Sequence, residues 1–125
     1  GMGCKKGTEE EKLASALAKC EERLLLYREA ICCLASISLK KEEPGLLALA
    51  EKLGLSFLTF TEQELKEVPG EFTGSSFVKS VTGVDNVCER SAVLASGQGR
   101  LLENKVCREG VTTAAAEKRW RIRFE

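Results

Sequence analysis

The N-terminal sequence GMGCKKGTEEEKL, residues 1–13, places glycines, a thiol and two lysines directly ahead of a helical pattern. Such a turn can hold a phosphate on its backbone N–H groups, present Cys4 as a nucleophile, or simply begin a helix. The G-x-G spacing with Gly7 departs from the dinucleotide fingerprint because the third glycine comes one position late, and no G-K-[ST] of a Walker motif follows. The two familiar phosphate-binding motifs are therefore poor matches.

Cys4 has surroundings that favour a thiolate. It precedes a predicted helix and lies beside Lys5 and Lys6, and positive charge and a helix N-terminus both lower a thiol pKa. A nucleophilic cysteine usually has a base partner, however, and the chain contains no histidine. Any catalysis must use carboxylates, amines, hydroxyls or Cys4, and a tight turn around a small buried thiol remains the alternative.

A second group of charged residues lies in SLKKEEPGLLALAEKLGL, residues 38–55. Lys40 and Glu43 occupy the connection between a predicted buried strand and a predicted helix. In an open α/β sheet, ligands bind where such connections leave the carboxyl ends of the strands, so we expect the glycine turn, residues 38–43 and Lys105 to converge on one edge of the sheet. The alternative is that Glu42 and Glu43 only favour the positive helix N-terminus while the lysines are solvated.

The predicted elements alternate between helix and strand through the first half. Capping-box spacing of Thr8 and Glu11, followed by an apolar stripe, predicts a first helix. A continuous apolar run at 30–37 predicts a strand buried on both faces, and LSFLTF, residues 55–60, predicts another buried strand. Pro44 and Gly54 are placed to begin and end the helix between these strands.

Capping signals predict two further helices in the second half. Thr61 with Glu64 predicts a short helix that stops near Pro69, and Asn86 with Glu89 predicts one that ends near position 97. Another helix is expected from about position 75, after a loop rich in glycine and serine. Residues 100–107 and 111–117, separated by the turn REG, predict a hairpin, and the alternation of RWRIRFE, residues 119–125, predicts a strand with one face in water.

These elements predict an α/β fold, a three-layer α/β/α sandwich on a mixed β-sheet with a C-terminal antiparallel hairpin. At 125 residues the chain has the length of one domain. Only two residues precede Gly3, so the chain either begins inside its first strand or has a very short one.

Composition excludes several classes of protein. Basic and acidic residues both number 19, so the net charge is zero and the basic face of a nucleic-acid-binding protein is not expected. The longest apolar stretch, from Ala30, is about half of what a membrane helix needs, and no secretory signal precedes it. We therefore expect a cytoplasmic protein without membrane contact, in which the six irregularly spaced cysteines are reduced.

Four segments in order resemble a known family: GMGCKKGT, SISLKKEEPGLLALAEKLGL, SSFVKSVTGVDNVCERSAVLASGQGRLLENK and GVTTAAAE. The chain is similar, from residue 1 to about 117, to the C-terminal domain of the cobalamin-biosynthesis protein CbiG, a domain shared with the smaller protein CobE. The resemblance implies the three-layer fold and a single domain over residues 1–125, joined to an N-terminal domain in the whole protein. It departs at Ser38, where the family usually has an acidic residue, and in the extension RWRIRFE.

CbiG is a cobalt-precorrin-5A hydrolase of the anaerobic route to vitamin B12, which opens a δ-lactone on the macrocycle and releases acetaldehyde. The resemblance thus implies a cobalt-corrin precursor as ligand, with no cofactor or metal of the protein's own because the cobalt belongs to the substrate. A non-catalytic, tetrapyrrole-binding accessory protein like CobE is the alternative.

The resemblance places the family's glycine turn on Gly1, Gly3, Cys4 and Gly7, its lysine and glutamate before the second helix on Lys40 and Glu43, and its late glutamate and lysine on Glu89 and Lys105. Glu43 is our candidate base for water, with Lys40 or Lys105 as the electrophilic partner. The alternative for Glu89 is that it only completes its capping box. The candidate substrate-binding residues, which pair with ligand carboxylates through charge or backbone N–H groups, are Gly3, Cys4, Lys5, Lys6, Gly7, Ser75, Ser76, Glu89 and Lys105.

Overall fold

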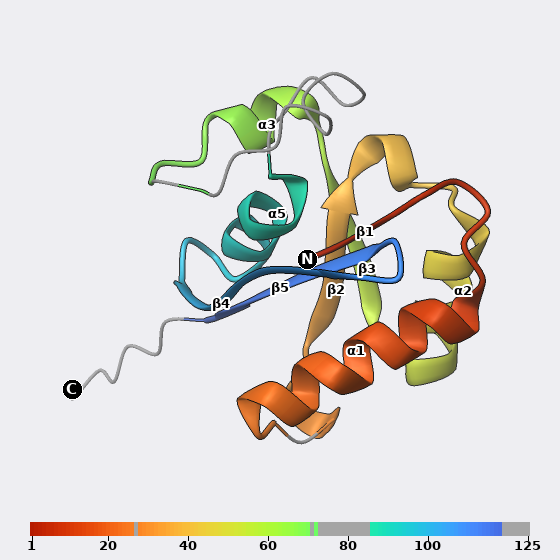
Figure 1. Ribbon diagram of the computed structural model, residues 1–125. Coiled ribbons are helices and arrows are strands. Elements are labelled where there is room, and N and C mark those ends of the chain that lie inside the picture. The colour runs from red at the N-terminus through yellow and green to blue at the C-terminus, as the bar shows by residue number, and fades with distance from the viewer. Residues whose placement is uncertain (27, 71, 73–85, 119–125) are drawn as a thin grey trace.

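The computed structural model describes residues 1–26, 28–70, 72 and 86–118. The helices lie on the two faces of a layer of strands (Figure 1). Helices α1 (Glu10–Leu24) and α2 (Pro44–Leu53) pack on each other and on one face. Helices α3 (Glu62–Lys66) and α5 (Val87–Ala95) cover the other face. The predicted three-layer α/β/α arrangement is confirmed.

The strand layer combines a parallel pair with an antiparallel group. β2 (Cys33–Ile37) and β3 (Ser56–Phe60) pair in parallel. β5 (Val111–Glu117) lies between β1 (Met2–Cys4) and β4 (Arg100–Arg108) and is antiparallel to both. β1 lies beside β2, although no hydrogen-bonded ladder joins the two groups in the described part of the chain. The mixed set of strands and the C-terminal hairpin were both predicted, and β1 is three residues long in this chain.

The main core lies between α1, α2 and the strands. Leu13 and Leu17 of α1 are buried together with Leu34, Leu46 and Leu49, as the apolar stripe of α1 predicted. The predicted capping box of Thr8 and Glu11 is wrong. Residue 9 occupies the N-cap position of α1, and the Thr8 hydroxyl instead donates to the Lys5 carbonyl at 2.6 Å, which closes the preceding turn.

Two strand predictions need correction. The strand expected at 30–37 begins only at Cys33, because Arg28–Ala30 form a short 3-10 helix. β3 is not buried on both faces: Ser56 and Leu58 are exposed, since β3 pairs with β2 alone among the described strands and so forms an edge.

The capping signals of the other helices are confirmed. Thr61 and Glu64 form a reciprocal capping box at α3, with N–O distances of 3.0 and 3.1 Å. α2 begins at Pro44 and ends before Gly54, whose φ of 67° suits glycine. The helix expected from about position 75 and the strand expected at 119–125 fall outside the described residues. None of the helices that the structure describes is both long and apolar enough to cross a membrane.

Candidate functional site

The glycine turn, residues 5–8 after β1, meets the β2–α2 loop, residues 38–43 after β2. The Gly7 N–H donates a hydrogen bond of 2.7 Å to Glu43 Oε1. Gly7 has a φ of 82°, and the turn around it is closed by the bond from Thr8 N to the Lys5 carbonyl. The carboxyl ends of β1 and β2 therefore lie at one edge of the strand layer, which we call the carboxyl edge.

Glu43 links these two segments through both carboxylate oxygens. Its side chain is almost buried, and Oε2 lies 3.8 Å from Lys40 Nζ while Oε1 accepts from Gly7. The Lys40 side chain is itself only 17% exposed. Both contacts tie the Glu43 carboxylate to the protein, and its role as a general base stays a prediction.

The start of α2 presses against the chain that enters α1. A Cβ atom added at Gly45 would lie 2.4 Å from the Thr8 carbonyl oxygen and 2.9 Å from Leu13 Cδ1. Because real Cβ contacts are longer than this, only glycine fits there without movement. The glycine turn and the β2–α2 loop are thus held together by packing as well as by Glu43.

Cys4 is not an activated nucleophile in this structure. Burial raises the pKa of the Cys4 thiol, and the nearby charge of Lys40 lowers it by less. The expectation that Lys5 and Lys6 lower this pKa is wrong, because both lie exposed in the glycine turn and the lysine that acts on the thiol is Lys40. The structure favours the alternative of a tight turn around a half-buried thiol.

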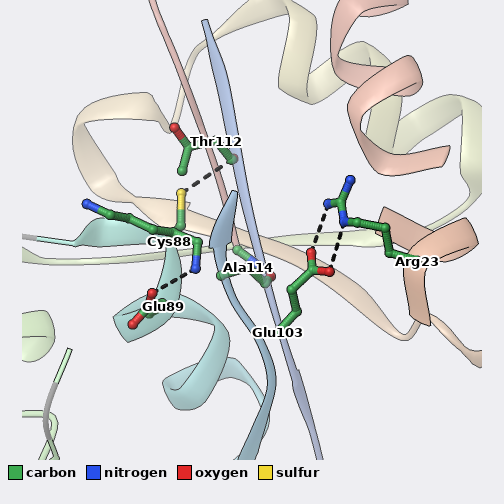
Figure 2. Close-up of polar contacts among 8 residues, drawn as sticks. Arg23, Cys88, Glu89, Glu103, Thr112 and Ala114 are labelled. Carbon is green, nitrogen blue, oxygen red and sulfur yellow. Dashed lines mark hydrogen bonds and ion pairs between the residues drawn. The ribbon is translucent and has the colours of Figure 1, made fainter. Parts of the chain in front are cut away.

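Glu89 connects the first turn of α5 to β4. Its side chain is fully buried, and Oε2 accepts a hydrogen bond of 2.7 Å from the backbone N–H of Lys105 (Figure 2). The Asn86 side chain caps α5 by accepting from Glu89 N at 3.0 Å, as predicted. The Glu89 carboxylate therefore reaches beyond α5, because it holds a strand residue 16 positions along the chain.

Cys88 lies between Gly3 of β1 and the charge of Lys105. Burial raises the pKa of the Cys88 thiol to about 12, while the positive charge of Lys105 acts on it in the opposite direction. Cys88 Sγ donates to the Thr112 carbonyl at 3.4 Å, and a Cβ atom added at Gly3 would lie 3.2 Å from that sulfur. β1 thus has Gly3 beside Cys88 and Cys4 within electrostatic reach of Lys40.

Most of the candidate residues thus gather around the carboxyl edge. The structure joins Gly7, Lys40 and Glu43 directly and brings Gly3, Glu89 and Lys105 into a neighbouring group. Ser75 and Ser76 lie outside the described residues. The contributions of Cys88 and of the ion pair between Arg23 and Glu103 were missed; no local spacing marks a contact between residues 80 positions apart.

Comparison with protein families gives one match that spans nearly the whole chain. Residues 1–116 match the family described as "Cobalamin synthesis G C-terminus". The chain belongs to this family. The resemblance to the CbiG C-terminal domain is thereby confirmed.

Curated relatives of this CbiG-family chain are much longer than it is. The chain is 40% identical over 112 residues to a cobalt-precorrin-5A hydrolase of Salmonella typhimurium. This alignment covers 90% of the chain and 32% of the relative. It is 34% identical over 101 residues to a protein of the same name from Priestia megaterium, covering 81% of the chain and 27% of the relative. The chain thus spans about a third of the length of these relatives.

Solved structures of the family share the fold. The crystal structure of CobE, a protein from the cobalamin biosynthetic pathway, superposes with a TM-score of 0.84 at 28% identity, covering 91% of this chain and 84% of that one. The cobalamin biosynthesis protein ChiG from Agrobacterium tumefaciens gives 0.73 at 25% identity, covering 94% and 95% of the two chains. A cobalamin biosynthesis protein G homologue from Sulfolobus solfataricus gives 0.69 at 27% identity, with 91% of this chain and 34% of that one covered.

Proposed function

We propose that the chain is the substrate-binding C-terminal part of a cobalt-precorrin-5A hydrolase, in the anaerobic route to cobalamin. The observation that supports this proposal most is the 40% identity, over 90% of the chain, to the Salmonella hydrolase. The remaining two thirds of such a hydrolase would complete the active site around the carboxyl edge.

The ligand chemistry suits the carboxyl edge. A corrin precursor carries acetate and propionate carboxylates around its rim, and charged hydrogen bonds to lysines and backbone N–H groups orient such groups. Lys5 and Lys6 lie exposed in the glycine turn, while the charge of Lys40 acts on Cys4 and the charge of Lys105 acts on Cys88. The ligand brings its own cobalt, and the proposal assigns no resident cofactor to the chain.

Lactone hydrolysis requires two functions from the protein. A base takes a proton from water as the oxygen adds to the lactone carbonyl carbon, and cationic or N–H donors stabilise the oxyanion that forms. The acyl C–O bond then breaks to leave a carboxylate and an alkoxide on the extruded carbon. As this alkoxide forms the C=O bond of acetaldehyde, the C–C bond that joined the extruded carbon to the macrocycle breaks, and its electron pair stays on the conjugated macrocycle. Glu43 is the proposed base and Lys40 or Lys105 the proposed oxyanion partner, and neither role needs histidine.

A tetrapyrrole-binding accessory role is the second candidate. It is favoured by the likeness to CobE, because the alignment covers 84% of that chain and leaves little of CobE without a counterpart. In this case the carboxyl edge binds and presents the macrocycle without performing chemistry. Both candidates require the same binding surface, and they differ in turnover.

Binding can be tested with the octacarboxylate uroporphyrin, followed by its absorbance. Replacing Lys40 or Lys105 by Met should each weaken binding about tenfold or more, since a charged hydrogen bond contributes about 1.5–3 kcal/mol. Lys19→Met is the matched control, because Lys19 lies on α1 in a solvent-exposed i,i+3 pair with Glu22. Added salt should weaken the wild type and the control in parallel and affect the two edge variants less. Equal affinities for all four proteins would refute the binding surface.

Turnover separates the two candidates. The isolated chain should release acetaldehyde from cobalt-precorrin-5A slowly or not at all, because a lone open edge does not exclude bulk water from the lactone. Fusion to the N-terminal two thirds of the Salmonella relative should restore release if the chain is a hydrolase domain, and should fail if it is an accessory. A rate of roughly 1 per second or faster from the chain alone would show that this domain holds the whole active site.

A further inference from the structure

β4 is irregular at the position of Lys105. Its pairing with β5 shifts register between Leu101 and Glu103 and again between Glu103 and Val106. A bulge of this kind bends the strand and redirects side chains, and bulges are frequent beside active sites. The backbone around Lys105 is therefore not fixed by a regular ladder and needs other contacts to define it.

Glu89 supplies such a contact from the α5 side. A fully buried carboxylate is costly unless it is hydrogen-bonded, and Oε2 of Glu89 receives the Lys105 N–H at 2.7 Å. Glu89 is itself fixed in the first turn of α5, where the Asn86 side-chain oxygen accepts a hydrogen bond from the Glu89 backbone N–H. The carboxylate thus joins a helix N-terminus to the irregular segment of β4.

An ion pair holds the same segment from the α1 side. Arg23 of α1 donates to both carboxylate oxygens of Glu103, with Nε 2.9 Å from Oε2 and Nη2 2.8 Å from Oε1. The Glu103 side chain is only 14% exposed. Figure 2 shows Glu89 and Glu103 on opposite sides of the β4 and β5 ribbons. The bulge is therefore fixed from both faces of the strand layer.

We propose that Glu89 is a positioning residue, which sets the backbone of the β4 bulge so that Lys105 presents its ammonium group to a ligand carboxylate at the carboxyl edge. The Lys105 backbone lies on the first turn of α5 through Glu89, and the lysine charge acts on the neighbouring Cys88, whose sulfur lies 3.2 Å from a Cβ atom added at Gly3. This inference rests on the proposed function, because it gives Lys105 a ligand carboxylate as its partner. Glu89 acts through Lys105 and does not touch the ligand.

A double-mutant cycle tests whether Glu89 acts through Lys105. The probe is uroporphyrin, and the variants are Glu89→Ala, Glu89→Gln, Lys105→Met and the double variant Glu89→Ala with Lys105→Met. We expect Glu89→Ala to weaken binding as much as Lys105→Met and to reduce its salt dependence equally, with no further loss in the double variant. Glu89→Gln keeps an acceptor oxygen for the Lys105 N–H and should retain most of the affinity. Glu51→Gln is the matched control. It removes one negative charge from an exposed position on α2, and it should bind uroporphyrin as the wild type does.

Amide hydrogen exchange tests the positioning without any ligand. The Lys105 N–H should exchange at least tenfold faster in Glu89→Ala than in the wild type, while the Glu89→Gln variant stays close to the wild type. The inference is overturned if the Lys105 N–H exchanges at the same rate in Glu89→Ala as in the wild type. It is also overturned if Glu89→Ala weakens uroporphyrin binding by the same factor in the wild-type and in the Lys105→Met background. If the wild type binds no uroporphyrin while Lys105 exchange depends on Glu89 as expected, the proposed function fails and the backbone tie stands alone.

Discussion

Replacing Glu43 by Ala should loosen the contact between the glycine turn and the β2–α2 loop. The substitution removes the acceptor of the Gly7 N–H, a charged hydrogen bond of 2.7 Å that contributes about 1.5–3 kcal/mol. It also removes the partner of Lys40, whose ammonium lies 3.8 Å from Oε2 and contributes up to about 1 kcal/mol. The free energy of unfolding should thus fall by about 2–4 kcal/mol, and Tm by roughly 10 °C. Glu43→Gln keeps an acceptor and should lose about half as much.

Urea denaturation followed by circular dichroism measures this difference, with Cm compared at constant m. The matched control is Glu42→Ala, because the neighbouring Glu42 is exposed and its loss should change stability by no more than about 0.5 kcal/mol. If Glu43→Ala is no more destabilising than this control, the bond to Gly7 does not hold the two segments together in solution. Glu43 would then be available as a base without any structural cost.

Three further predictions concern packing and thiols. Gly45→Ala should destabilise the protein by about 1–3 kcal/mol in urea denaturation, because the added Cβ would press on the Thr8 carbonyl. Alanine usually stabilises a helix relative to glycine, so unchanged or increased stability would contradict this contact. Cys88 alone should lower the free energy of unfolding by about 1.4 kcal/mol per pH unit above pH 9, since the folded state retains the Cys88 proton to about pH 12 and the unfolded state does not; Cys88→Ala should lack this part of the slope. The denatured, unreduced protein should yield six thiols with Ellman's reagent, and four or fewer would show a disulfide.

Local sequence signals predicted the elements whose ends are fixed by neighbouring residues. Pro44 and Gly54 gave the limits of α2, and Thr61 with Glu64 gave the start of α3, because a proline, a left-handed glycine and a capping box act within one helical turn. The signal at Thr8 failed for a related reason. In a capping box the Thr8 hydroxyl would accept from a backbone N–H of the helix, but here it donates to the Lys5 carbonyl of the preceding turn, and residue 9 is the N-cap.

Contacts between distant residues were predicted only where a topological rule applied. The rule that loops meet at the carboxyl ends of parallel strands brought Gly7 and Glu43 together across 36 positions. No comparable rule exists for the carboxylate of Glu89 on the Lys105 backbone, since it depends on a bulge that the pattern of β4 does not reveal. The pKa of Cys4 was misjudged because burial, which the sequence does not give, outweighs the nearby charge.

The uneven exposure of the six thiols makes the chain ready for selective labelling. Cys32 and Cys107 are exposed, whereas the other four are buried or half-buried and burial raises the pKa of each. Cys32 lies just before β2 and Cys107 near the carboxyl end of β4, so a maleimide dye would attach at opposite ends of the strand layer. With Cys32 replaced by Ser, a single fluorophore at Cys107 would stand two residues from Lys105. Its emission would report the arrival of a light-absorbing macrocycle at the carboxyl edge by energy transfer, without any added cysteine.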